Sequence, residues 1–142
     1  MVGASALMGG ANAPWLAVHW LLMESAYDLF QRGTALLAQG DFHAAVVPLT
    51  RARDLEPGKD SIREALGRAL FHAQRYEQAR EEFEAIVEHT PTNDYALFCL
   101  GRSLQQLGRH AEARHPLALA SNLRPERRDY RVYRDRSRKR AA

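Results

Sequence analysis

The sequence lacks the motifs that would support an enzyme or a metalloprotein. It contains one cysteine, Cys99, which excludes an intrachain disulfide and a zinc site built from several thiolates. It has no GK[ST] phosphate-binding loop, no serine nucleophile elbow and no two histidines spaced four residues apart. Nothing in the sequence supplies a base for Cys99, which we interpret as a small packing residue. We therefore expect a non-catalytic protein with no metal and no cofactor.

Charged residues are absent from positions 1–23. The apolar run Pro14–Met23 could form a short helix with Pro14 in its first turn. A signal peptide or membrane anchor is the alternative. A signal peptide needs basic residues before the apolar run and a cleavage site after it, and the sequence has neither. The run is also far shorter than the stretch of about 20 apolar residues that spans a bilayer. We expect residues 1–25 to form a leader or an extra helix, and a disulfide-free chain fits a cytoplasmic location.

Lysine is scarce, because 18 of the 20 basic residues are arginine. Together with abundant alanine, this bias favours a GC-rich bacterial genome. The formal net charge of +3 is unevenly distributed. From Arg124 onward there are nine basic and three acidic residues, a net charge of +6, so residues 1–123 carry −3. The basic character of the chain therefore belongs to its C-terminal tail.

A skeleton of small and apolar residues recurs every 34 positions, without insertion. Its most complete copy is Gly67, Leu70, Tyr76, Ala79, Phe83 and Pro91. The upstream copy is Gly33, Leu36, Phe42, Ala45, Leu49 and Pro57. The downstream copy is Gly101, Leu104, His110, Ala113, Leu117 and Pro125. A period of this length indicates a stacked array of helix–turn–helix units, here 26–59, 60–93 and 94–127.

The repeated glycines indicate a close contact between the two helices of each unit. Glycine inside a helix costs about 0.8–1 kcal/mol relative to alanine, so three such costs need a shared cause. We expect Gly33, Gly67 and Gly101 to allow close backbone approach, with Ala45 and its equivalents opposite. Gly40 and Gly108 suit the left-handed conformation that ends a helix. The middle unit has Gln74 in its turn, which must close without glycine.

Other residues predict local features of the second helices and the tail. Pro48 and Pro116 fall within the second helices of units one and three, where we expect kinks and not breaks. An acidic face on the second helix of unit two is expected to be solvated; it comprises Glu81, Glu82, Glu84 and Glu88. Residues 128–142 are expected to form a basic capping helix and tail, with Tyr130, Val132 and Tyr133 packed on unit three.

At the positions of the 34-residue skeleton, the sequence resembles the tetratricopeptide repeat (TPR) family. The pattern of that family includes a Leu-Gly pair, an alanine and a closing proline. The pair is present as Leu66-Gly67 and Leu100-Gly101, while Arg32 replaces its leucine in unit one. The resemblance implies an all-α, right-handed superhelical array closed by a C-terminal capping helix. It also implies a non-catalytic protein–protein interaction module that binds a peptide segment of a partner in its concave groove.

By the same resemblance, the groove is lined by fixed positions of the first helices. The residues expected there are Tyr27, Phe30, Thr34, Glu64, Arg68, Phe71, His72, Tyr95, Phe98, Arg102 and Gln105. Aromatic and arginine side chains are enriched at binding hot spots, although some of these rings could simply pack on the leader or the tail. The carboxylate clamp of chaperone-binding TPR domains is not matched, because its positions hold Phe30, Thr34, Ala65, Tyr95 and Cys99.

Two alternatives to peptide binding stay open. A basic tail can bind nucleic acid or another polyanion through phosphate contacts, or it can be a solvated end cap. The tail residues concerned are Arg131, Arg134, Arg136, Arg138, Lys139 and Arg140. A short array can also self-associate through an exposed end. The identity of the partner protein is not predicted by the sequence.

Overall fold

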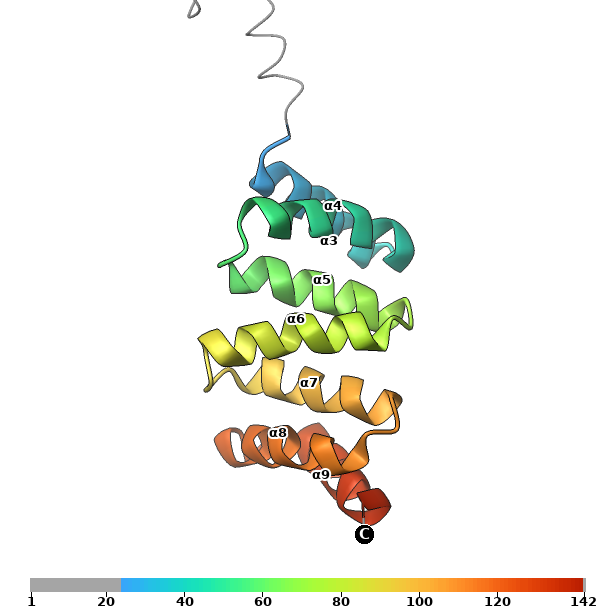
Figure 1. Cartoon of the computed structure of the whole chain (residues 1–142), viewed down its shortest axis with the longest axis vertical. Coiled ribbons are helices and arrows are strands. Elements are labelled where there is room, and N and C mark those ends of the chain that lie inside the picture. Colours follow the sequence, from blue (N-terminus) through green and yellow to red (C-terminus); the bar gives the residue numbers. More distant parts are fainter. Residues whose placement is uncertain (1–23, 142) are drawn as a thin grey trace, which may run out of the picture.

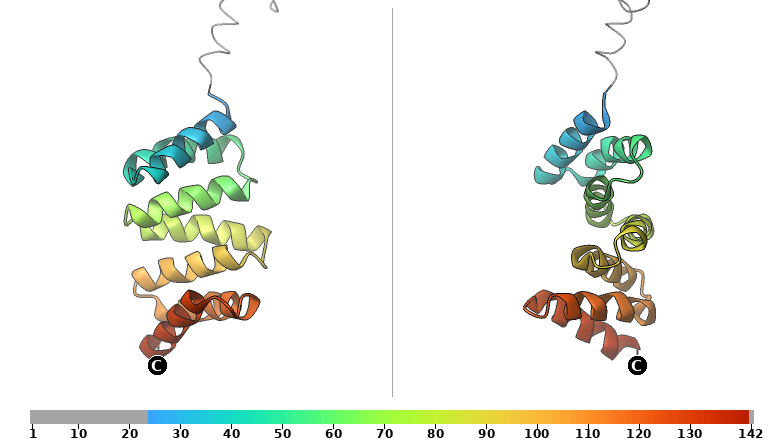
Figure 2. Two further views of the ribbon diagram at one scale, coloured as in Figure 1. Left: turned by 180° about the vertical axis from the view of Figure 1, so that it is seen from behind. Right: turned by 90° about the vertical axis from the view of Figure 1, so that its left-hand side faces the viewer.

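The computed structural model describes residues 24–141 as a stack of α-helices with no strand among them. The helices follow one another along the long axis of the molecule, from α3 at one end to α9 at the other (Figure 1). Two further views show the same stack from behind and from the side (Figure 2). The expected all-α repeat array is confirmed. The expected leader or extra helix falls almost wholly at residues 1–23, outside the described part of the chain.

The helices repeat with the period of the sequence. First helices begin at residues 26, 60, 94 and 128, and second helices begin at residues 42, 76 and 110. The first helices are α3 (Ala26–Ala38), α5 (Asp60–His72), α7 (Asp94–Gln106) and α9 (Arg128–Ala141). The second helices are α4 (Phe42–Leu55), α6 (Tyr76–His89) and α8 (His110–Leu123). The tail helix α9 therefore occupies the place of a fourth first helix.

The turns within the units share one backbone conformation. Gly40 and Gly108 have φ values of +79° and +75°, as their sequence positions predicted. In the middle unit Gln74 adopts the same left-handed conformation, with a φ of +63°. Gln74 thus accepts a conformation that disfavours residues with a Cβ atom. The turn of the middle unit therefore has the same shape as the other two turns, although glutamine disfavours a positive φ.

The three helix-interior glycines contact large side chains of the second helix. A Cβ atom at Gly67 would lie 2.7 Å from the ring of Phe83, and one at Gly33 would lie 2.4 Å from Leu49. Gly101 meets Leu117 in the same way. Each glycine makes room for a large apolar side chain of the following helix, and that side chain is almost fully buried. Ala45, Ala79 and Ala113, expected opposite the glycines, are fully buried.

The prolines inside the second helices do not interrupt them. Pro48 lies within α4 and Pro116 within α8, and both helices are continuous over 14 residues. Both proline side chains are buried, so their rings contribute to packing. The expectation that the helices would not break at these positions is confirmed.

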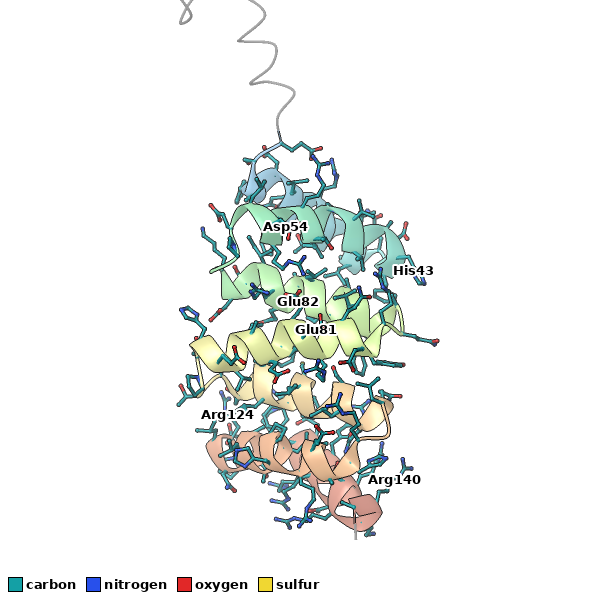
Figure 3. The ribbon with its side chains drawn as sticks, in the orientation of Figure 1. His43, Asp54, Glu81, Glu82, Arg124 and Arg140 are labelled. Carbon is teal, nitrogen blue, oxygen red and sulfur yellow. The ribbon has the colours of Figure 1, made fainter. Side chains whose placement is uncertain are left out.

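Glu82 does not belong to a solvated acidic face, as its sequence position suggested. It is only 4% exposed and its carboxylate accepts hydrogen bonds from two arginines on neighbouring helices. Arg53 of α4 bonds Glu82 Oε1, and Arg63 of α5 bonds Oε2 at 2.8 Å. Figure 3 labels Glu82 on α6 beside its exposed neighbour Glu81. One buried charge therefore ties together three consecutive helices, and its burial is compensated by two partners.

The capping helix α9 covers the last repeat through aromatic and polar contacts. Tyr130 is fully buried, and its hydroxyl donates a 2.8 Å hydrogen bond to Asp94. Ser137 is also fully buried and accepts a hydrogen bond from the side chain of Gln105. Tyr133 packs against the buried side chains of Leu104, Ala113 and Leu117 in unit three, as predicted. Val132 is 43% exposed, so its expected packing on unit three was wrong.

We expect Gly67→Leu to destabilise the fold by about 3 kcal/mol, because the new side chain must displace the buried ring of Phe83. The measurement is the urea midpoint of unfolding followed by circular dichroism. Gly58→Leu is the matched control, since no atom lies within 4 Å of a Cβ at Gly58. Equal midpoints for the two variants would show that the glycine contact is not needed.

We expect Glu82→Ala to lower the free energy of unfolding by about 2 kcal/mol, because it leaves two guanidinium groups facing each other without their shared carboxylate. Partial solvent access to Arg53 and Arg63 limits the loss. Glu81→Ala on the same helix is the control and should stay within about 0.5 kcal/mol of the parent. Identical losses at both positions would refute a specific role for the buried cluster.

Candidate functional site

The inner face of the array is formed by the first helices α3, α5, α7 and α9. Helices α3 and α5 touch directly, as do α7 and α9. Between α5 and α7 the main chains hardly meet, and a pocket of about 130 Å³ opens there. It is lined by Arg68, Phe71, His72, Phe83, Tyr95, Phe98, Cys99 and Arg102. All of these except Phe83 and Cys99 were predicted groove residues, so the structure brings together the parts of the site that units two and three contribute.

The walls of this pocket are aromatic and its rim is cationic. Phe71 and Tyr76 meet edge to face, with ring centroids 5.2 Å apart. The side chain of Arg102 lies 5.6 Å from the ring centroid of Phe71, and that of Arg68 is exposed. Burial lowers the pKa of the Arg102 guanidinium, which stays charged because its ordinary value is so high. The pocket can thus accept an apolar side chain next to a negatively charged group.

His72 and Glu64 occupy the edges of the pocket region on α5. His72 is exposed and stacks on Phe42 of unit one, with ring centroids 4.6 Å apart. Glu64 is partly exposed one helical turn before Arg68. The single acidic side chain predicted for the groove thus lies beside one of its arginines.

Two predicted groove residues are covered by the capping helix. Phe98 stacks on Tyr130 at 4.5 Å and meets Tyr133 edge to face at 5.6 Å. Gln105 is buried and donates hydrogen bonds to the backbone carbonyl of Tyr133 and to Ser137. The placement of Gln105 in an open groove was wrong, because α9 lies over it. Phe98 lines the pocket with one part of its ring and packs on the tail with the rest.

The predicted residues of unit one lie apart from this pocket. Tyr27 is exposed and its hydroxyl accepts a 2.7 Å hydrogen bond from Gln31. Phe30 packs partly into the core between units one and two. The hydroxyl of Thr34 donates to the carbonyl of Phe30 at 2.9 Å and therefore serves its own helix. Tyr27 and Phe30 line a separate hollow of about 280 Å³ at the amino end of α3.

The tail arginines divide into those bonded to the body and those directed to solvent. Arg131 donates to the carbonyl of Pro125, and Arg134 donates to Ser121 at 3.1 Å. Arg138 lies 3.8 Å from Asp135. Lys139 and Arg140 are exposed at the end of α9, where Figure 3 labels Arg140. Arg136 lies over the ring of Tyr133 at 4.6 Å, on the same aromatic cluster as the pocket.

Tyr133 and Arg136 are the site residues that the sequence interpretation placed elsewhere. Arg136 was assigned to a separate polyanion-binding tail and Tyr133 to packing alone. Arg136 follows Arg102 by one repeat period, just as Arg102 follows Arg68. Extending the period into a fourth first helix would have found this relation.

The lone thiol, Cys99, lines the pocket and is not activated. Burial raises the pKa of Cys99 to about 12. Burial likewise raises the pKa of the neighbouring Tyr95 hydroxyl above its ordinary value. A protonated thiol is a poor nucleophile, so Cys99 behaves as a packing residue.

Two further findings bear on the class of site. Within residues 24–141 no cluster of three histidine, cysteine or acidic side chains is arranged to hold a metal ion. None of the helices in that range is both long enough and apolar enough to cross a membrane.

Comparison with protein families agrees with this architecture. Two models described as tetratricopeptide repeat match the chain, one over residues 36–99 and the other over residues 75–126. Together they extend over residues 36–126, and the chain belongs to the tetratricopeptide repeat family. Repeats of this family are typically not enzymes. A search of curated protein sequences finds no significant match.

Several solved structures share the fold at low sequence identity. A MamA chain, the RS-1 ArsTM double mutant, is 24% identical over 82% of this chain, with a TM-score of 0.78, and this chain spans 65% of it. The first TPR of Spaghetti (RPAP3), bound to the HSP90 peptide SRMEEVD, has a TM-score of 0.76 at 17% identity, covering 81% of this chain and 91% of its own. The Sgt2 TPR domain from Aspergillus fumigatus has a TM-score of 0.74 at 15% identity, covering 82% and 78%. These similarities establish the fold.

We expect Cys99 to resist alkylation in the folded protein, because burial holds the thiol protonated. At pH 8 iodoacetamide should react roughly 100-fold more slowly with the native chain than with the chain unfolded in urea. Mass spectrometry of timed samples measures both rates, and Cys99 is the only thiol present. Similar rates in the two states would contradict the buried, protonated thiol.

Proposed function

We propose that this chain is a non-catalytic cytoplasmic adaptor that binds a peptide segment of a partner protein along its inner face. The observation that carries the proposal is the pocket between α5 and α7, where aromatic walls lie beside Arg68 and Arg102. Such a combination supports anchoring of one apolar side chain, with a charged group of the ligand held at the rim. The TPR fold supports a role as an interaction module.

The likeness to the first TPR of Spaghetti supports a peptide as the ligand class, since that domain was solved with a peptide. The positions that form the carboxylate clamp of chaperone-binding domains carry Phe30, Thr34, Ala65, Tyr95 and Cys99 here. None of these is a cation. A ligand of this chain would therefore meet its cations at Arg68 and Arg102, on the first helices of units two and three.

Selection of peptides from a random display library tests the proposal. Peptides enriched on the parent protein should lose at least about 10-fold in affinity on Arg68→Glu, because the variant places a negative charge at the pocket rim. Arg51→Glu is the matched control, since Arg51 is also exposed but lies on the second helix α4. Circular dichroism melts verify that both variants are folded.

Failure to enrich any peptide would argue against a peptide-binding inner face. Equal effects of Arg68→Glu and Arg51→Glu on the enriched peptides would argue against this pocket as the binding site. Enrichment together with selective loss on Arg68→Glu would support the proposal.

A further inference from the structure

Arginine occupies the same position in three consecutive first helices. Arg68 on α5, Arg102 on α7 and Arg136 on α9 follow one another by one repeat period, and each is the ninth residue of its helix. The equivalent residue of α3 is Thr34, whose hydroxyl bonds its own helix. The three arginines therefore form a line that crosses the inner face from α5 to the capping helix, and we name this line the arginine ladder.

Aromatic rings pack against the last two arginines of the ladder, Arg102 and Arg136. The Cζ atom of Arg102 lies 3.8 Å from the ring centroid of Tyr133 and 5.6 Å from that of Phe71. The Cζ atom of Arg136 lies 4.6 Å from the same Tyr133 ring. Two like charges thus share one ring, and the charge of Arg136 adds to burial in lowering the pKa of Arg102. Stacking fixes the planes of the guanidinium groups while their N–H edges remain able to donate.

No carboxylate neutralises the ladder within the described part of the chain. No acidic side chain of residues 24–141 lies within ion-pair distance of Arg68, Arg102 or Arg136, although most other arginines of the array have an acidic partner. The polar contact of Arg102 is with the neutral side chain of Gln105, at 3.3 Å. Glu64 lies one helical turn from Arg68 but beyond ion-pair distance. The repulsion between Arg102 and Arg136 has no carboxylate beside it in the described helices, and an anionic ligand would relieve it.

We infer that the arginine ladder makes this module selective for an acidic segment of a partner protein, whose Asp or Glu side chains bind one to each rung. The inference rests on the proposed function and names its ligand class. A guanidinium group binds a carboxylate through two parallel N–H···O hydrogen bonds. Each of the three arginines of the ladder can therefore hold one carboxylate of the ligand. The three arginines lie on successive first helices, so a ligand that reaches more than one of them must be an extended segment that crosses from α5 toward α9.

The charge distribution favours an acidic peptide over nucleic acid. Residues 1–123 carry a net charge of −3, and the net positive charge of the chain comes from residues 124–142. A long polyanion that extended from the ladder toward α3 would meet the acidic body of the array, and only the short segment 124–142, which contains α9, would offer it further net positive charge. A short segment with a few carboxylates would contact only the ladder and could place an apolar side chain in the neighbouring pocket.

Fluorescence anisotropy with defined probes tests the inference. The probe is a fluorescein-labelled peptide of about twelve residues with Glu at every third position and a central Leu. Its control has Gln in place of every Glu, and an oligothymidylate of similar length represents nucleic acid. The full chain should bind the Glu peptide at least about 10-fold more tightly than the Gln peptide, with affinity falling as salt is raised.

Substitutions along the ladder should weaken the Glu peptide specifically. Arg68→Gln and Arg136→Gln are each expected to cost about 3- to 10-fold in affinity while leaving the weak Gln-peptide binding unchanged. Arg138→Gln is the matched control, because Arg138 is exposed on α9 two residues beyond Arg136 and lies outside the ladder. Arg136→Lys keeps the charge but not the planar stacking, and should recover only part of the loss.

Several results would overturn the inference. Equal affinity for the Glu and Gln peptides would remove acidic selectivity but leave the proposed peptide groove intact. An equal loss on Arg136→Gln and Arg138→Gln would assign binding to the general charge of the tail. Tighter binding of oligothymidylate than of the Glu peptide would favour nucleic acid. Absence of any Glu-peptide binding at millimolar concentration would reject the ladder as a carboxylate site.

Discussion

The fold depends on one contact that is repeated in every unit. A glycine in the first helix leaves space for a large apolar side chain of the second helix, as with Gly67 and Phe83. This contact fixes how closely the two helices approach, and the helix starts then recur with the period of the sequence. Because each unit has the same geometry, equivalent positions of successive first helices fall in line along one face. The arginine ladder depends on that regularity.

Charge is used in two different ways in this array. The buried carboxylate of Glu82 joins Arg53 and Arg63, and thereby ties α4, α5 and α6 together. The arginines of the ladder have no such partner among residues 24–141, and aromatic rings hold two of them instead. A paired buried charge serves the packing of helices, whereas an unpaired charge at a pocket rim is available to a ligand. The same residue type thus has opposite roles at neighbouring places.

Much of the fold could be predicted because its period is strict, but several contacts could not. The repeat boundaries and the left-handed turn at Gly40 follow from residue spacing alone. Glu82 was misplaced because helical periodicity does not show which residues of a neighbouring unit approach a given face. Gln105 was misplaced because a capping helix was expected without its register. Arg68 and Phe71 were predicted as groove residues from the resemblance to the TPR family, and both line the pocket.

By itself the sequence determined the kind of fold, the lengths of the units and the repeated apolar residues of the core, because these depend on local preference and on a period along the chain. Tertiary structure alone decided which side chains meet between helices that are distant in sequence. It placed α9 in register as a fourth first helix, covering Phe98 and Gln105. It also brought Arg136 onto the same ring as Arg102, joining a tail residue to the groove. Such contacts depend on packing between units, which no local pattern specifies.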